Sequence, residues 1–263
     1  MKLHRPQCFI FACLALAPQA QAQVEQLPEI QIVAPRNPTI GVADSASEGA
    51  AERESFQSRP KLRPGDIIEA VPGVVATQHS GDGKANQYFL RGFNLDHGTD
   101  FSIQLDGMPI NLPTHAHGQG YSDLNFLIPE LVSGVRYRKG PYSVDAGDFS
   151  LAGSAHINYV STLAQPFAQF TLGPNNYQRS LIAGSRSDDD QTWLGAFELV
   201  GNDGPWQNAE GLRKFNAVLR YTQGTRSQGW NVTAMAYDSR WNATDQIPQR
   251  SIDDGTLSRF GPI

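Results

Sequence analysis

Two histidines stand close together in a short segment that reads PTHAHGQGYSD over residues 113–123. His115 and His117 are two positions apart, so in an extended segment their side chains lie on the same side of the backbone. Imidazole nitrogens bind metal ions and exchange hydrogen bonds near neutral pH. This spacing therefore predicts a ligand-contact site, for which a chelated metal is one suitable ligand.

Three further side chains are candidates for the same site. Gln119 lies in the same segment, whereas His79 and His97 lie on other predicted loops. The alternative interpretation is that these histidines only hydrogen-bond one part of the fold to another. Because two histidines without a third clear ligand do not make a metal site, we predict ligand contact and neither a resident metal nor another cofactor.

The chain opens with the features of a secretory signal peptide. Lys2 and Arg5 precede an apolar run over residues 8–17, and the small-x-small cleavage site AQA follows at residues 20–22. The run is shorter than the roughly 20 residues that a membrane-spanning helix needs. We therefore predict that the mature protein begins at Gln23 and works outside the cytoplasm.

Composition excludes several classes of protein. The two cysteines, Cys8 and Cys13, lie within the leader, so the mature chain has no disulfide framework and needs a large core or a membrane. Removal of the two basic residues of the leader from the 21 in the chain leaves 19 against 26 acidic ones, which argues against nucleic-acid binding. Because GxSxG, HExxH and P-loop patterns do not occur, we predict that the protein is not an enzyme.

Three stretches of different composition follow the leader at residues 1–22. Residues 23–60 are polar and rich in small side chains, which predicts a flexible tether. Residues 61–163 alternate short apolar runs with Gly and Pro turns, which predicts a small α+β domain. We expect one or two helical turns at residues 66–70. Strands are expected at residues 74–77, 87–90, 101–105, 135–138 and 155–160, with a tight turn at Asp106-Gly107.

Residues 164–263 show a different periodicity, with about five segments of roughly nine to eleven alternating residues. In one segment Phe215 and Leu219 share a face opposite Asn216 and Arg220. This pattern favours the antiparallel strands of a transmembrane β-barrel over a soluble β-sandwich. Five strands cannot close a barrel, and we therefore expect the barrel to be incomplete, in an N-terminal fragment or a truncated product.

The middle of the chain carries a series of motifs in a fixed order. They are DIIEAVPGV, FLRGF at residues 89–93, LDGMPI at residues 105–110, and Ile128-Pro129 followed by Lys139-Gly140-Pro141. This series resembles the plug domain of TonB-dependent outer-membrane receptors. With the residues before and after it, the resemblance covers residues 23–263 in the order of tether, plug and first barrel strands.

The resemblance gives a role to an isolated strand-like segment between Pro28 and Pro35. It implies that residues 29–34 are a TonB box, which pairs as an added strand with TonB of the inner-membrane energising complex. The expected TonB-binding residues are Glu29, Ile30, Gln31, Ile32, Val33 and Ala34. A flexible tether around the box allows that pairing.

The resemblance also assigns the plug motif residues. It implies that Arg91, next to Gly92, is buried in the barrel lumen and paired with barrel carboxylates. Asp106 and Gly107 are expected to form a turn. Gly140, beside Pro141, is expected to be a turn and packing residue. The segment after the Asp106-Gly107 turn resembles the plug region near the extracellular apex, where the ligand contacts named above would meet a substrate.

These expectations lead to one predicted function and to alternatives. The resemblance implies a receptor in the outer membrane of a Gram-negative cell, with a periplasmic N-terminus, that binds a small-molecule solute and imports it when TonB pulls on the plug. A metal chelate such as a siderophore is the favoured substrate, and outer-membrane lipid surrounds the barrel. The alternative is a non-transporting adhesin or docking surface. A signal-transducing receptor is not expected, because only six residues, Gln23 to Pro28, precede Glu29 in the predicted mature chain.

Overall fold

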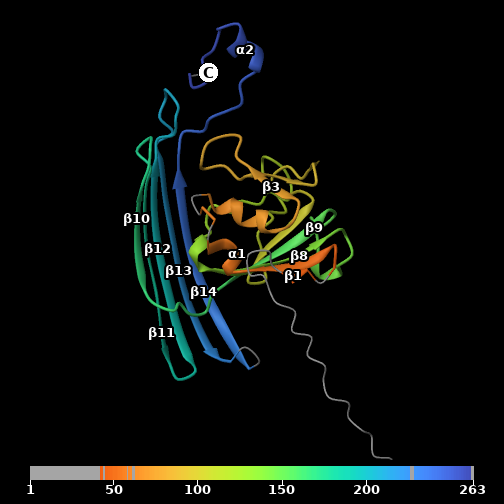
Figure 1. The fold of residues 1–263 in the computed structure, drawn as a ribbon, viewed down its shortest axis with the longest axis vertical. Coiled ribbons are helices and arrows are strands. Elements are labelled where there is room, and N and C mark those ends of the chain that lie inside the picture. Colours follow the sequence, from red (N-terminus) through yellow and green to blue (C-terminus); the bar gives the residue numbers. More distant parts are fainter. Residues whose placement is uncertain (1–41, 44, 58, 61–62, 226–227, 262–263) are drawn as a thin grey trace, which may run out of the picture. The chain divides into compact units, whose positions relative to one another are not determined.

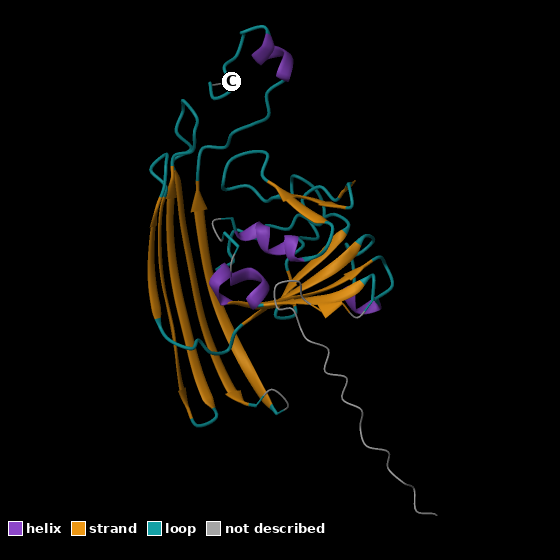
Figure 2. Ribbon diagram, in the orientation of Figure 1, coloured by secondary structure: helices purple, strands orange, loops and turns teal. Residues whose placement is uncertain are grey.

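The computed structural model describes residues 42–43, 45–57, 59–60, 63–225 and 228–261 (Figure 1). The predicted signal peptide and TonB box lie outside the described residues. Within the described part of the chain, three sheets account for most of the regular structure, and the helices are short (Figure 2). None of the helices described there has the length and apolar character required to cross a membrane.

A six-stranded mixed sheet forms the centre of the predicted plug domain. Its strand order is β1-β2-β8-β9-β6-β7, and β6 pairs with β9 in parallel while the other neighbours are antiparallel. Its strands are β1 (Val42–Ala43), β2 (Glu48–Glu52), β6 (Phe101–Leu105), β7 (Met108–Pro109), β8 (Val132–Lys139) and β9 (Gly153–Tyr159). The strands predicted at residues 101–105, 135–138 and 155–160 are therefore present in this sheet.

Part of the predicted tether belongs to this sheet. Strand β2 pairs antiparallel with β8, with Ala51 opposite Val135, and α1 (Glu54–Gln57) follows it. Along β2 the small side chains of Gly49 and Ala51 are buried while Glu48 is exposed, so small residues alternate here as larger apolar ones do elsewhere. The predicted boundary at residue 61 thus falls after the chain has already joined the sheet.

A smaller antiparallel sheet and short 3₁₀ helices complete this domain. The sheet contains β3 (Val74–Thr77), β4 (Gln87–Leu90) and β5 (Phe93–Asn94), and the helices are η1 (Pro64–Ala70), η2 (Pro129–Leu131) and η3 (Val144–Ala146). Helix η1 matches the expected helical turns, and proline begins both η1 and η2, where its missing N–H is not needed. The core of the domain contains fully buried Ile68, Tyr88, Phe101, Ile103, Leu127, Leu131 and Ile157.

The C-terminal part forms one five-stranded antiparallel sheet in which each strand pairs with the next along the chain (Figure 1). Its strands are β10 (Phe167–Leu172), β11 (Gln178–Asp188), β12 (Gln191–Asn202), β13 (Leu212–Gly224) and β14 (Gly229–Arg240), and α2 (Gln249–Asp253) follows. Strands β10 and β14 are the two edges and do not pair with each other in the described chain. The structure therefore has the expected open set of about five strands.

The faces of this sheet have the opposite polarity to those of a soluble protein. Leu219 is 52% exposed and Val232 is 59% exposed, whereas Asn216 and Glu198 on the other face are only 1% exposed. Arg220 is also buried. This burial confirms the faces predicted from the sequence, with apolar side chains on the exposed face and several polar ones buried.

Candidate functional site

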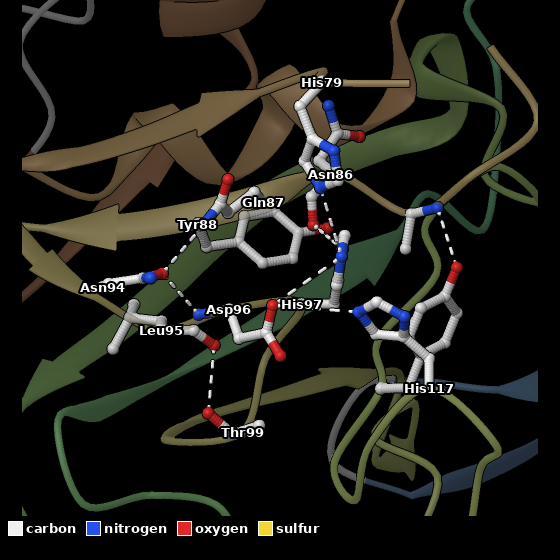
Figure 3. Close-up of polar contacts among 12 residues, drawn as sticks. His79, Asn86, Gln87, Tyr88, Asn94, Leu95, Asp96, His97, Thr99 and His117 are labelled. Atoms are coloured by element: carbon white, nitrogen blue, oxygen red, sulfur yellow. Dashed lines mark hydrogen bonds and ion pairs between the residues drawn. The ribbon is translucent and has the colours of Figure 1, made fainter. Parts of the chain in front are cut away.

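Three histidines and one aspartate converge between the loops of the small sheet and the segment at residues 113–123 (Figure 3). The metal-binding atoms of Asp96, His97 and His117 all lie within 4.8 Å of one another. The Nε2 atom of His79 lies 3.3 Å from Nε2 of His97. We call His79, Asp96, His97 and His117 the histidine cluster.

His97 is the fixed member of this cluster. Its side chain is only 2% exposed, and its Nδ1 lies 3.0 Å from the backbone oxygen of Asn86, to which a protonated Nδ1 donates (Figure 3). That bond leaves the lone pair on Nε2, which points toward the other members of the cluster. Burial lowers the pKa of His97, which favours the neutral imidazole at pH 7.

The β4–β5 hairpin places Asp96 and His97. After the hairpin, the N–H of Tyr88 donates to the oxygen of Asp96 at 2.8 Å, which ties the segment back onto β4. Asp96 has a φ of +50°, and its N–H donates to Oδ1 of Asn94 at 2.8 Å. Aspartate tolerates this left-handed conformation better than most residues. Its carboxylate Oδ1 then lies 3.7 Å from Nε2 of His97.

A closed loop brings His117 to the same place. Leu112 and Tyr121 form an isolated antiparallel bridge, so residues 113–120 fold back on themselves. The N–H of Ser122 donates to the backbone oxygen of His97 at 2.7 Å, which joins the base of this loop to the fixed histidine. As a result Nε2 of His117 lies 3.9 Å from Oδ1 of Asp96, and its side chain is 37% exposed.

The side chain of Asn111 links the segment that carries His97 to the loop that carries His117. Its buried Oδ1 accepts the N–H of Ile103 at 2.7 Å. Its Nδ2 lies 2.8, 3.0 and 3.1 Å from the backbone oxygens of Gly98, Phe101 and Gly120, which share its two hydrogens. Gly98 has a φ of +119°, and a Cβ there would lie 2.9 Å from the oxygen of Gly120. Sequence reasoning missed Asn111, since nothing local marks it as a clamp.

The structure separates the two histidines that the sequence paired. His115 stacks on Tyr121 with ring centroids 4.0 Å apart, and its Nδ1 accepts the N–H of His117 at 3.1 Å. It therefore supports the loop, whereas His117 reaches the cluster. Gln119 is exposed. Asp96 provides the third ligand group that the sequence analysis lacked.

His79 connects the cluster with a cavity. Its Nδ1 lies 3.0 Å from Nε2 of Gln246, which follows β14. His79 thus also makes a hydrogen bond between two parts of the fold, as the alternative interpretation of the histidines expected. His79 also lines a cavity of about 1150 Å³ whose walls include Trp206, Asn242 and Arg259. A solute that enters this cavity can therefore reach one side of the histidine cluster.

A second polar group of residues joins the mixed-sheet domain to the five-stranded sheet. Arg179 on β11 is 3% exposed, and its two Nη atoms each lie 2.8 Å from an oxygen of Glu130 in η2. Its Nε donates to Glu198 on β12 at 2.6 Å. Lys214 and Asn216 on β13 also contact Glu198, at 3.5 and 2.6 Å. Arginine suits this position because its planar fork binds carboxylates in a bidentate manner.

A separate ion pair lies further along the same junction. Arg220 on β13 donates from Nη1 to Oδ2 of Asp106 at 2.8 Å. Oδ1 of Asp106 accepts the N–H of Tyr159 at 3.2 Å. We call these contacts together the ion-pair seam; its charged members are Asp106, Glu130, Arg179, Glu198, Lys214 and Arg220.

Comparison with known proteins fixes the family of the mixed-sheet domain. A family model described as the TonB-dependent Receptor Plug Domain matches residues 43–154. The chain contains a TonB-dependent receptor plug domain. Its match begins at residue 43, in agreement with the early entry of the chain into the sheet at β2.

Solved structures show the same fold beyond the plug domain. The ferric citrate transporter FecA in its unliganded form matches with a TM-score of 0.61 and 15% identity over 82% of this chain and 34% of that chain. The copper transporter OprC matches with a TM-score of 0.59 and 15% identity over 76% of this chain and 32% of that chain. A mutant of the ferric enterobactin receptor PfeA from Pseudomonas aeruginosa, bound to enterobactin, matches with a TM-score of 0.52 and 15% identity over 77% of this chain and 34% of that chain. The chain thus spans about a third of the length of these structures.

The plug motif residues lie mostly at turns. Arg91 is exposed at the turn between β4 and β5, with a φ of +52°, and forms no ion pair within the described part of the chain. Its burial in a barrel lumen beside barrel carboxylates stays a prediction. In the seam, sheet cations pair with plug carboxylates. Asp106 and Gly107 form the predicted turn, with φ of +49° and +85°, and Asp106 additionally belongs to the seam. Gly140 follows β8, where its N–H donates to Ala152 at 2.7 Å, and Pro141 is exposed.

Proposed function

We propose that this chain belongs to an outer-membrane receptor that binds a scarce extracellular solute and imports it into the periplasm with energy transmitted by TonB. The observation that carries the proposal is a plug domain held by buried ion pairs against a sheet whose opposite face exposes apolar side chains. An apolar outer face with polar side chains inside is typical of outer-membrane strands. The proposal places that face in lipid and the N-terminus in the periplasm.

The energy-coupling part of the proposal rests on residues 29–34, outside the described residues. A strand-like segment between two prolines has no neighbour in sequence to pair with, and an added-strand complex with TonB would satisfy its backbone groups. An adhesin or other docking surface has no need of such a segment. The box therefore favours import over simple binding.

A metal-bearing solute is the substrate class that we propose. FecA is a ferric citrate transporter, PfeA is a ferric enterobactin receptor, and OprC is a copper transporter. The histidine cluster of this chain offers the imidazole nitrogens that transition metals prefer. Both observations support a metal ion or a metal chelate over an oligosaccharide.

Replacement of Ile32 by Pro in the receptor tests the import proposal. Proline removes one backbone N–H and fixes φ, so it should break strand pairing at the centre of the box. Residues 29–34 precede the residues that the plug family model matches, so folding and surface binding should persist. Radioactive zinc and radioactive ferric citrate are tested separately. The one that the unaltered receptor imports should still bind at the cell surface, but its accumulation inside the cells should fall to background.

The matched control is Ile32→Ala, which keeps the backbone donor and should retain most of the uptake. Binding and accumulation are measured on the same whole cells. Normal accumulation by Ile32→Pro would contradict the role of the box, and it would leave residues 27–36 as a linker. Loss of surface binding together with uptake would indicate misfolding, which an outer-membrane fractionation would reveal.

A further inference from the structure

The separations of Asp96 from His97 and His117 suit a metal ion better than they suit direct hydrogen bonds. Oδ1 of Asp96 lies 3.7 Å from Nε2 of His97 and 3.9 Å from Nε2 of His117 (Figure 3). Both distances exceed the range of a hydrogen bond. Three ligand atoms therefore point into one small volume without bonding one another, which is the arrangement that a bound cation would complete.

These separations are close to those of a tetrahedral site. With metal–nitrogen bonds of about 2.0–2.1 Å, two ligand atoms on one tetrahedral ion lie about 3.3 Å apart. The ligand atoms of Asp96, His97 and His117 lie within 4.8 Å of one another, and His79 contacts His97 by a separate hydrogen bond of 3.3 Å. The contacts of Asp96 at 3.7 and 3.9 Å need to shorten by less than about 1 Å, which rotamer adjustment of partly exposed side chains can supply.

We propose that Asp96, His97 and His117 bind one first-row divalent transition metal ion of the Zn²⁺ and Cu²⁺ class, with His79 next to His97 at the edge of the site. Imidazole nitrogens together with one carboxylate favour these ions over Mg²⁺ and Ca²⁺, which prefer oxygen ligands. The carboxylate supplies a negative charge, and no Lys or Arg lies within ion-pair distance of Asp96 among the described residues.

The environment of His97 is that of an oriented metal ligand. Metal-binding histidines commonly donate their other ring N–H to a carbonyl or carboxylate, which fixes the tautomer. The Nδ1 of His97 makes such a contact with the backbone oxygen of Asn86 at 3.0 Å. Asn111 and the Leu112–Tyr121 bridge hold the loop that carries His117. His97 is buried, whereas Asp96 and His117 are partly exposed, so an ion can reach the site from the surface.

This site also narrows the substrate class, a step that rests on the proposed function. Direct binding by histidine requires a cargo with exchangeable coordination positions, such as a hydrated ion or a labile complex. A hexadentate ferric chelate leaves no position for an imidazole. The proposed cargo is therefore the metal ion itself, captured by ligand exchange at the plug.

Metal titration of the purified chain in detergent micelles tests the site independently of uptake. We expect one Zn²⁺ per chain by calorimetry, and a Co²⁺ complex with the strong visible absorption of a tetrahedral site. His117→Ala and Asp96→Asn should each weaken Zn²⁺ binding by more than about tenfold. His117 lies on a partly exposed loop and the aspartate substitution keeps its size, so circular dichroism should report an unchanged fold for both.

A histidine outside the cluster provides a matched control. His156→Ala on β9 should leave the stoichiometry and the Co²⁺ spectrum unchanged. Unaltered affinity in His117→Ala and in Asp96→Asn, or an equal loss in His156→Ala, would overturn the site. If the cluster binds Zn²⁺ as expected but Ile32→Pro does not impair accumulation, the proposed function fails while the metal site stands.

Discussion

The ion-pair seam and the histidine cluster are both groups of polar side chains in the same fold, but they differ in how their atoms are satisfied. In the seam, Arg179 has carboxylate partners at 2.6 and 2.8 Å, and Arg220 has one at 2.8 Å. In the histidine cluster, Asp96 faces two imidazoles at 3.7 and 3.9 Å, too far for hydrogen bonds.

This difference separates structural polar groups from groups available to a ligand. Buried charges are retained when each has a partner of opposite charge, because an unpaired buried charge is costly. The seam meets that condition and fixes the plug on the sheet. In the histidine cluster only His97 is buried, whereas Asp96 and His117 are partly exposed and open to a cation. We therefore expect seam substitutions to change stability and cluster substitutions to change binding.

The largest effect on stability is expected from Arg179→Met. This substitution leaves Glu130 and Glu198 without their shared cation, and breaking a buried pair costs about 3–5 kcal/mol. The free energy of unfolding, measured by urea titration of the chain in micelles, should fall by that amount. Arg186→Met is the matched control, because Arg186 is exposed on the same strand and its loss should cost less than about 0.5 kcal/mol. A loss below about 1 kcal/mol for Arg179→Met would show that the seam does not hold the plug.

An intermediate effect is expected from Asn111→Leu. Leucine has a similar volume but leaves the N–H of Ile103 and the carbonyls around the loop without their partner, which costs about 1–3 kcal/mol. The loop at residues 113–120 should then show faster amide hydrogen exchange, and Zn²⁺ affinity should fall with it. Exchange in β11–β13 should stay as in the unaltered chain. Unchanged exchange in the loop would contradict the clamp role of Asn111.

The smallest effect on stability is expected from His117→Ala. The side chain is 37% exposed and forms no hydrogen bond with another described residue, since its contact with Asp96 is 3.9 Å long. Its loss should therefore change the free energy of unfolding by less than about 0.5 kcal/mol. The same urea titration measures this change without metal. A loss as large as that of Arg179→Met would remove the distinction between the two polar groups.

The parts of the fold that depend on local sequence were predictable. Strand β6 and the Asp106-Gly107 turn follow from alternation and turn chemistry within ten residues. The faces of β12 and β13 follow from a period of two. The strand at Glu48–Glu52 was not recognised, because its buried residues are Gly and Ala, which resemble those of a flexible segment.

The polar contacts were less predictable because they join residues far apart in the chain. Asp96 meets His117 only through the β4–β5 hairpin and the loop closed by Leu112 and Tyr121. Arg91 belongs to a motif that implies burial in a barrel lumen, and a left-handed turn exposes it in the described part of the chain. Sequence identifies which residues can bind or pair, whereas the crossing of distant segments decides which of them do.

The central claim is that the converging imidazoles are a ligand site and the paired charges a scaffold. Anomalous diffraction from crystals of the chain grown with Zn²⁺, recorded on both sides of the zinc absorption edge, tests it most directly. The account predicts one strong peak among the side chains of Asp96, His97 and His117, with bonds of about 2.0–2.2 Å to them. A strong peak elsewhere, with none in the cluster, would contradict it.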